Sequence, residues 1–139
     1  MIVLDTNVMS ALMRAPDNPG VVAWLDRQPQ VTVWTTAICV MEVRFGLRIM
    51  PAGRRKEARI KEFERILADE LQNRILPFDS DAAEHTARLM DRRHKAGRAG
   101  ELRDTMIAGI ALAQNATLAT RNVKHFSDTG VAIVDPWQA

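Results

Sequence analysis

The chain has few of the residues on which several classes of site depend. It contains no tyrosine and only one cysteine, Cys39, among its 139 residues. A single cysteine excludes both an internal disulfide and a cysteine zinc cluster. Because Cys39 lies in an apolar stretch, we expect it to be a small buried side chain. The cysteine content fits a reducing, cytoplasmic setting.

Segments that direct a chain to a membrane are also missing. The N-terminus lacks the basic region and the long apolar run of a secretory signal. The longest apolar helical stretch, residues 106–113, is too short to span a bilayer. No glycine-rich loop follows the first apolar run, which argues against a dinucleotide-binding domain. We therefore expect no membrane association.

The composition, with 47% hydrophobic and 26% charged residues, is typical of a globular domain. The length of the chain predicts a single domain over residues 1–139. The net charge is only +2, yet 15 of the 19 basic residues are arginine, whose planar group matches phosphate geometry. This permits nucleic-acid binding, and a solvated arginine-rich surface explains the composition equally well.

Short apolar runs alternate with amphipathic segments, which predicts an α/β fold around a mostly parallel sheet. The predicted strands are residues 2–4, 31–34, 74–76, 117–119 and 131–134. The predicted helices are residues 6–13, 19–28, 36–49, 54–71, 80–95 and 101–115. The expected helix-capping residues are Asn18, Thr35 or Thr36, and Ser80.

The first strand ends in a carboxylate, Asp5, which Thr6 and Asn7 follow at once. In open α/β sheets, ligands bind outside the carboxyl ends of the strands, so Asp5 is placed to carry a reactive group. Capping of the next helix is an equally good explanation of this aspartate.

Glu42 is the second acid with a suggestive position. Ile38, Met41, Phe45 and Ile49 recur at helical spacing and predict a core-facing stripe that Glu42 shares. A metal ligand is one interpretation of an acid on such a stripe. The alternative is a glutamate at the edge of the stripe that reaches water or pairs with an arginine.

Asp104 is the third acid, and it shares a helix face with Ile107 and Ala108. It also lies in the first turn of its helix, where the macrodipole favours a negative charge by about 0.3–1 kcal/mol. Glu101 is better placed for that role at the helix N-terminus. No lysine or arginine shares the faces of the three acids, so together they predict a site for a cation.

A fourth element, Thr120-Arg121-Asn122, follows the strand 117–119 and so lies at the same edge of the sheet. Thr120 offers a hydroxyl, and Asn122 offers a neutral amide oxygen that a hard metal accepts. A turn with an asparagine cap is the alternative. Three carboxylates and an amide at one edge favour Mg²⁺ or Mn²⁺ and hence phosphate chemistry.

These residues, in this order, resemble the PIN-domain nucleases, and more narrowly the VapC toxins of bacterial toxin–antitoxin pairs, including the FitB-like branch. The matching segments are 2–7, 41–46, 74–79, 104–108, 119–122 and 135–137. The resemblance covers essentially the whole chain and implies a three-layer PIN fold. It also implies an RNA-cleaving enzyme that leaves a 5′-phosphate and a 3′-hydroxyl, a cognate antitoxin and a homodimer.

The resemblance assigns the metal-binding acids to Asp5, Glu42 and Asp104. A fourth position falls on Asn122, where many relatives place aspartate, and this departure concerns a second metal more than the first. Substrate-positioning roles fall on the three residues Thr6, Thr120 and Arg121. His125 lies close by in the chain, although a surface or capping role suits it better. The candidates for steering RNA are Arg44, Arg48, Arg54, Arg55, Lys56, Arg92, Arg93 and Arg121.

Two other functions remain open. An aspartyl phosphatase would use Asp5 as its nucleophile, although such enzymes need a second acid where this chain has Asn7. A degenerate PIN fold acting only through a partner protein is the second, and Asn122 is its best support.

Overall fold

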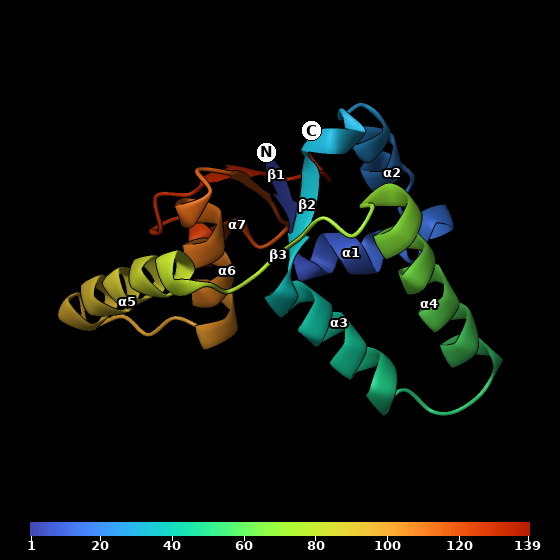
Figure 1. Ribbon diagram of the computed structural model, residues 1–139, viewed down its shortest axis with the longest axis horizontal. Coiled ribbons are helices and arrows are strands. Elements are labelled where there is room, and N and C mark those ends of the chain that lie inside the picture. The colour runs from blue at the N-terminus through green and yellow to red at the C-terminus, as the bar shows by residue number, and fades with distance from the viewer.

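Five strands form one parallel sheet, and helices cover both of its faces (Figure 1). The computed structural model describes residues 1–139. The strands are β1 (Ile2–Leu4), β2 (Val33–Thr36), β3 (Ile75–Leu76), β4 (Thr117–Ala119) and β5 (Ala132–Val134). They lie in the order β3-β2-β1-β4-β5, and every neighbouring pair is parallel. The predicted α/β class is confirmed, and β1 occupies the centre of the sheet.

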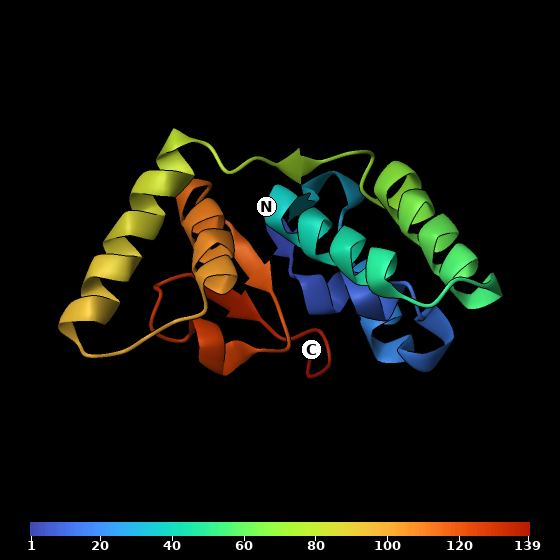
Figure 2. The same cartoon turned by 90° about the horizontal axis from the view of Figure 1, so that it is seen from below.

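The helices form the two outer layers. They are α1 (Thr6–Leu12), α2 (Pro19–Asp26), α3 (Ala37–Ile49), α4 (Arg54–Arg65), α5 (Ser80–Lys95), α6 (Leu102–Ala113) and α7 (Val123–Phe126). Figure 2 shows α5 and α6 on one side of the strands and α1 to α4 on the other. None of these helices combines the length and the apolar character needed to cross a membrane.

The core is divided by the sheet into two clusters. Successive strand residues point to opposite faces, so Leu4 packs with side chains of α1, α2 and α4, whereas Val3 packs with those of α5 and α6. Gly109 lets α5 and α6 approach closely, because a side chain at this position would collide with Thr86. The central strand that carries Asp5 is thereby fixed from both faces.

Several boundaries differ from the predictions. The second strand lies at 33–36 rather than 31–34, because Thr35 pairs with Ile75 of β3 and donates its hydroxyl to the Leu4 carbonyl at 2.9 Å. Val31 is left 73% exposed in a 3₁₀ turn at Gln30–Thr32. The helix predicted over 54–71 ends at Arg65 and continues as a π-helical turn at Ile66–Glu70.

The helix caps agree only in part with the predictions. Thr36 accepts a hydrogen bond from the Cys39 amide, as expected. The cap of α5 is Asp79 rather than Ser80. Asn18 occupies the N-cap position of α2, yet its side chain donates to the preceding Ala11 and Arg14 carbonyls. The short helix α7 was not predicted from the sequence.

Candidate active site

Asp5 and Thr120 meet at the carboxyl edge of the sheet because β1 and β4 are neighbouring parallel strands. The amide of Asp5 donates to the Ala119 carbonyl at 2.9 Å, which extends the strand pairing to the first residue beyond β1. The edge location predicted for both residues is therefore correct.

The carboxylate of Asp5 is almost completely buried, with 3% of the residue exposed. One oxygen, Oδ1, accepts a hydrogen bond from the Thr6 amide at 2.8 Å, and the other, Oδ2, accepts one from the Thr120 hydroxyl at 2.7 Å. Asp5 thus caps α1 as well as occupying the sheet edge, so the two interpretations of this residue hold together.

The pKa of Asp5 is raised from 3.8 to about 6, and burial is the largest cause. The hydrogen bonds from Thr120 and Thr6 oppose this effect, while the charges of Asp104 and Glu42 add to it. No lysine, arginine or histidine forms an ion pair with Asp5. Its negative charge is stabilised by neutral donors alone, which leaves room for a cation.

Glu42 is joined to Asp5 through a single residue, since the Thr6 hydroxyl donates to Glu42 Oε1 at 2.8 Å. The other carboxylate oxygen lies 3.6 Å from the Arg103 guanidinium. No arginine was expected on the helix faces of the three acids, and the approach of an arginine from another helix to Glu42 was not predicted. Arg103 comes from the first turn of α6, and the sequence alone does not bring that turn beside α3.

The predicted core-facing stripe of α3 is confirmed at Ile38, which is 7% exposed, and is wrong at its other three positions. Met41, Phe45 and Ile49 are 49%, 58% and 68% exposed. The core-facing side of α3 is made instead by residues four apart, namely Cys39, Val43 and Leu47. Both sets fit a helical period, and packing against the sheet selects the second. Glu42 is half-buried at the boundary between the two faces, with its carboxylate beside Thr6.

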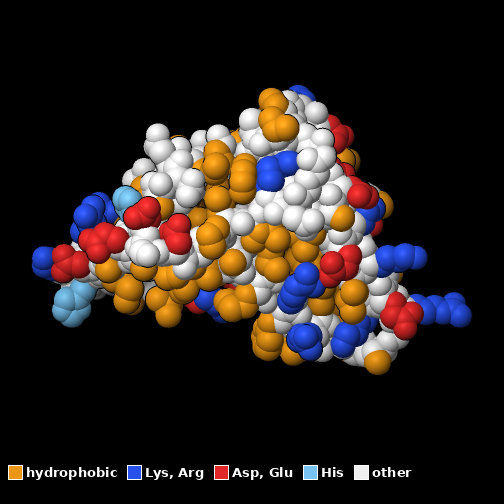
Figure 3. Space-filling model, viewed as in Figure 1, with side chains coloured by type: hydrophobic (Ala, Val, Ile, Leu, Met, Phe, Trp, Pro, Cys, Tyr) orange, Lys and Arg blue, Asp and Glu red, His pale blue; other side chains and the backbone are white.

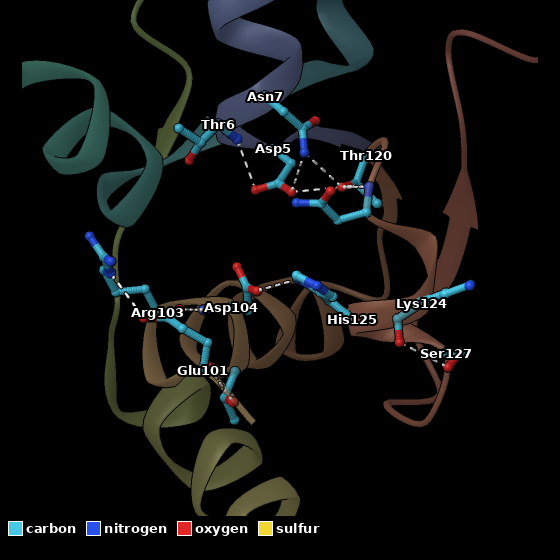
Figure 4. Close-up of polar contacts among 12 residues, drawn as sticks. Asp5, Thr6, Asn7, Glu101, Arg103, Asp104, Thr120, Lys124, His125 and Ser127 are labelled. Carbon is cyan, nitrogen blue, oxygen red and sulfur yellow. Dashed lines mark hydrogen bonds and ion pairs between the residues drawn. The ribbon is translucent and has the colours of Figure 1, made fainter. Parts of the chain in front are cut away.

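Asp104 is held in the first turn of α6, where its amide donates to Glu101 Oε2 at 2.9 Å. Glu101 is thus the N-terminal cap of the helix, as predicted, and the Asp104 side chain is free for another role. One of its oxygens lies 3.1 Å from Nδ1 of His125, which is 60% exposed (Figure 4). This contact was not predicted from the sequence.

Thr120 and Asn7 form hydrogen bonds with Asp5 and with each other. Thr120 is fully buried, and besides donating to Asp5 its hydroxyl accepts from the Asn122 amide at 3.0 Å. Asn7 donates weakly to Asp5 Oδ2 and Thr120 at 3.4 and 3.3 Å, and it accepts from the Arg121 amide. Thr120, expected to position substrate or a metal-bound water, acts on the site through Asp5.

Asn122 and Arg121 lie at the exposed rim of the same edge. Asn122 takes the N-cap position of α7, but its side chain makes no capping hydrogen bond, so its amide oxygen is free to bind. The Arg121 guanidinium lies 4.9 Å from the centre of the Trp137 ring. That stacking leaves the outer face of the guanidinium available to a phosphate or a base.

The polar residues form two groups that face one another (Figure 4). Asp5, Thr6, Asn7 and Thr120 make the first, and Asp104 with His125 makes the second. No three histidine, cysteine, aspartate or glutamate side chains converge closely enough to hold a metal ion as they stand. The donors are nevertheless the carboxylate and amide oxygens that Mg²⁺ and Mn²⁺ prefer.

Comparisons with known proteins agree with this geometry. The model of the PIN domain matches residues 2–131. The chain is 41% identical over 138 residues to the VapC ribonuclease Y4jK of Sinorhizobium fredii, covering 99% of both proteins. It is 35% identical to the toxin FitB of Neisseria gonorrhoeae, again over 99% of each.

A crystal structure of FitAcB from Neisseria gonorrhoeae shares the fold with a TM-score of 0.90 and 34% identity, and each chain is covered completely. The overall fold is thus shared with a solved relative over the full length of both chains. The chain belongs to the PIN-domain family.

Proposed function

We propose that this protein is a metal-dependent ribonuclease and the toxin of a toxin–antitoxin pair, acting in the cytoplasm. The observation that carries the proposal is the buried carboxylate of Asp5, which has no cationic partner, is linked to Glu42 through Thr6 and faces Asp104 across the site. The relatives called a VapC ribonuclease and a toxin match almost the full length of the chain.

The three carboxylates are the proposed ligands of Mg²⁺, for which Mn²⁺ can substitute, and the Asn122 amide oxygen completes the set. Such an ion, when bound, activates a water molecule and neutralises charge that develops on the phosphate. The chemistry of the donors fits this cation, because all are oxygens and one of them, the Asp5 carboxylate, has no ion pair.

The surrounding residues orient these carboxylates. Thr6 holds Asp5 with its amide and Glu42 with its hydroxyl, so one residue fixes the separation of the two acids. Thr120 fixes the second oxygen of Asp5 from the opposite side. Arg121, exposed at the rim, is the proposed contact to the RNA backbone.

The two alternative functions are less well supported. A phosphatase nucleophile must reach its substrate, whereas Asp5 is 3% exposed and both of its oxygens accept hydrogen bonds. Asn7, in the place of the second acid, is committed to Thr120 and the Arg121 amide. A purely structural module gives no reason for three carboxylates at one edge.

Cleavage of RNA by the purified protein tests the proposal. Wild type should cleave RNA with Mg²⁺, and Asp104→Asn should abolish cleavage while the melting temperature stays within a few degrees of wild type. Asp91→Asn is the matched control, since Asp91 is an exposed partner of Lys95 away from the site. Retained cleavage in Asp104→Asn would remove this residue from the site. An inactive wild type would favour the degenerate module.

A homodimer is part of the proposal, and the exposed face of α3 supports it. Met41, Phe45 and Ile49 project from one side of this helix, and surfaces that expose apolar side chains together mark interaction sites. Figure 3 shows hydrophobic side chains beside basic ones over the lower part of the molecule, where α3 ends and α4 begins. Light scattering should give a dimer for wild type and a monomer for Phe45→Glu.

A further inference from the structure

A polar cavity of about 260 Å³ adjoins the carboxylate site on the side of Asp104. Only one of its nine lining residues, Ala99, is hydrophobic, and Asp104 itself forms part of the wall. The remaining wall comes from the loop between α5 and α6 and from α7. Figure 4 shows Lys124 and His125 on α7, on the same side of the site as Asp104. The cavity therefore shares Asp104 with the proposed catalytic centre.

One wall of this cavity is built rigidly around Arg93. This residue, predicted from the sequence to steer RNA at the surface, is only 8% exposed. Its guanidinium donates to both oxygens of Asp128 at 2.9 Å and to the Thr105 hydroxyl at 2.7 Å. A further hydrogen bond reaches the His125 carbonyl at 3.1 Å. Arg93 thereby ties α5 to α6 and α7 and holds the cavity open beside Asp104.

The cavity wall carries three cations and three acids, including Asp104, and these charges are unequally paired. Asp128 is neutralised by Arg93, which lowers the pKa of that carboxyl to about 2. Glu101 is paired with Arg103 at 3.1 Å and caps α6. Lys124 makes no ion pair, and exposed Arg98 reaches Asp128 only at 4.0 Å. Two positive charges are therefore left without a close partner, next to the carboxylates.

We propose that this cavity binds a phosphate of the RNA strand next to the scissile one, with Lys124 and Arg98 as its cationic contacts. The proposal rests on the proposed function, because the scissile phosphate lies at the carboxylates and its neighbour lies within reach of the adjoining wall. A polar cavity with two unpaired cations suits an anionic group rather than a base. The metal-binding acids repel the RNA phosphates that do not lie at the metal. The two cations therefore set the register of the RNA strand.

Salt dependence of RNA binding tests this assignment. Binding of a labelled single-stranded RNA is measured by fluorescence anisotropy between about 50 and 200 mM salt, in an Asp5→Asn background that prevents cleavage. Each phosphate contact contributes about 0.7 to the slope of log affinity against log salt. Lys124→Gln should reduce the slope by about that amount. Lys61→Gln, an exposed lysine on α4 without an ion pair, is the matched control and should leave the slope unchanged.

A second variant acts without removing a cation. Ala99→Asp places a negative charge on the wall at an exposed loop residue, and it should weaken RNA binding and slow cleavage in the otherwise wild-type protein. If Lys124→Gln binds RNA with an unchanged salt slope, the proposed phosphate site is overturned. The proposed ribonuclease activity is retained in that case, provided that wild type still cleaves RNA. Reduced binding of a protein partner with an unchanged RNA slope also overturns the phosphate site. Failure of both binding and cleavage would remove the proposed function and this site with it.

Discussion

Replacing Asp5 by asparagine should stabilise the metal-free protein above neutral pH. The folded state buries this carboxylate and raises its pKa from 3.8 to about 6, so the ionised form is disfavoured in the fold. Asparagine keeps the acceptor for the Thr6 amide, and its new amide can replace the weak Asn7 donor at the Thr120 hydroxyl, which has two acceptor positions. The substitution therefore removes the buried charge and retains most of the hydrogen bonding.

The magnitude follows from the pKa. A change from 3.8 to about 6 corresponds to about 3 kcal/mol. The pKa of Asp5 is higher in the folded state than in the unfolded state. The contribution of Asp5 to the free energy of unfolding is therefore fully present below pH 3.8 and is lost as pH rises through about 6. The Asp128 carboxyl, whose pKa is lowered to about 2, acts oppositely, and its stability is lost only as pH falls below about 4. The interval from pH 4 to 7 therefore reports on Asp5.

Urea denaturation of both proteins, in the presence of a chelator, measures the effect. Wild type should lose up to about 3 kcal/mol of unfolding free energy between pH 4 and 7, whereas Asp5→Asn should lose much less. Parallel curves for the two proteins would show that Asp5 ionises normally, and the argument for an uncompensated carboxylate would then fail.

Three further results are expected. Mg²⁺ at about ten times its dissociation constant should stabilise wild type by about 1.4 kcal/mol, seen as a rise in melting temperature that Asp5→Asn lacks. Asn122→Asp should tighten Mg²⁺ binding in calorimetry, and an unchanged affinity would place residue 122 outside the ligand set. Gly109→Ala should cost about 1–3 kcal/mol in urea denaturation, because the new methyl group meets Thr86 and the Ala82 carbonyl. An unchanged midpoint would mean that α5 and α6 separate freely.

The fold class and the position of Asp5 at the carboxyl edge of the sheet follow from the amino-acid sequence alone. Alternating short apolar runs and amphipathic segments specify strands and helices through local periods. Parallel strands bring the residues that follow β1 and β4 to one edge, so Asp5 and Thr120 could be placed at that edge without coordinates, whereas their direct contact follows from the pairing of β1 with β4. The cap at Glu101 also followed, because capping depends on residues three apart in the chain.

Two features follow from the tertiary structure alone. One is which face of a helix is buried, and the other is which side chains distant in the sequence make contact. Two apolar rows of α3 fit the same period, and packing on the sheet buried Val43 and Leu47 instead of Phe45. The contacts of Glu42 with Arg103 and of Asp104 with His125 join separate elements. They depend on how α3, α6 and α7 pack, which no local pattern records.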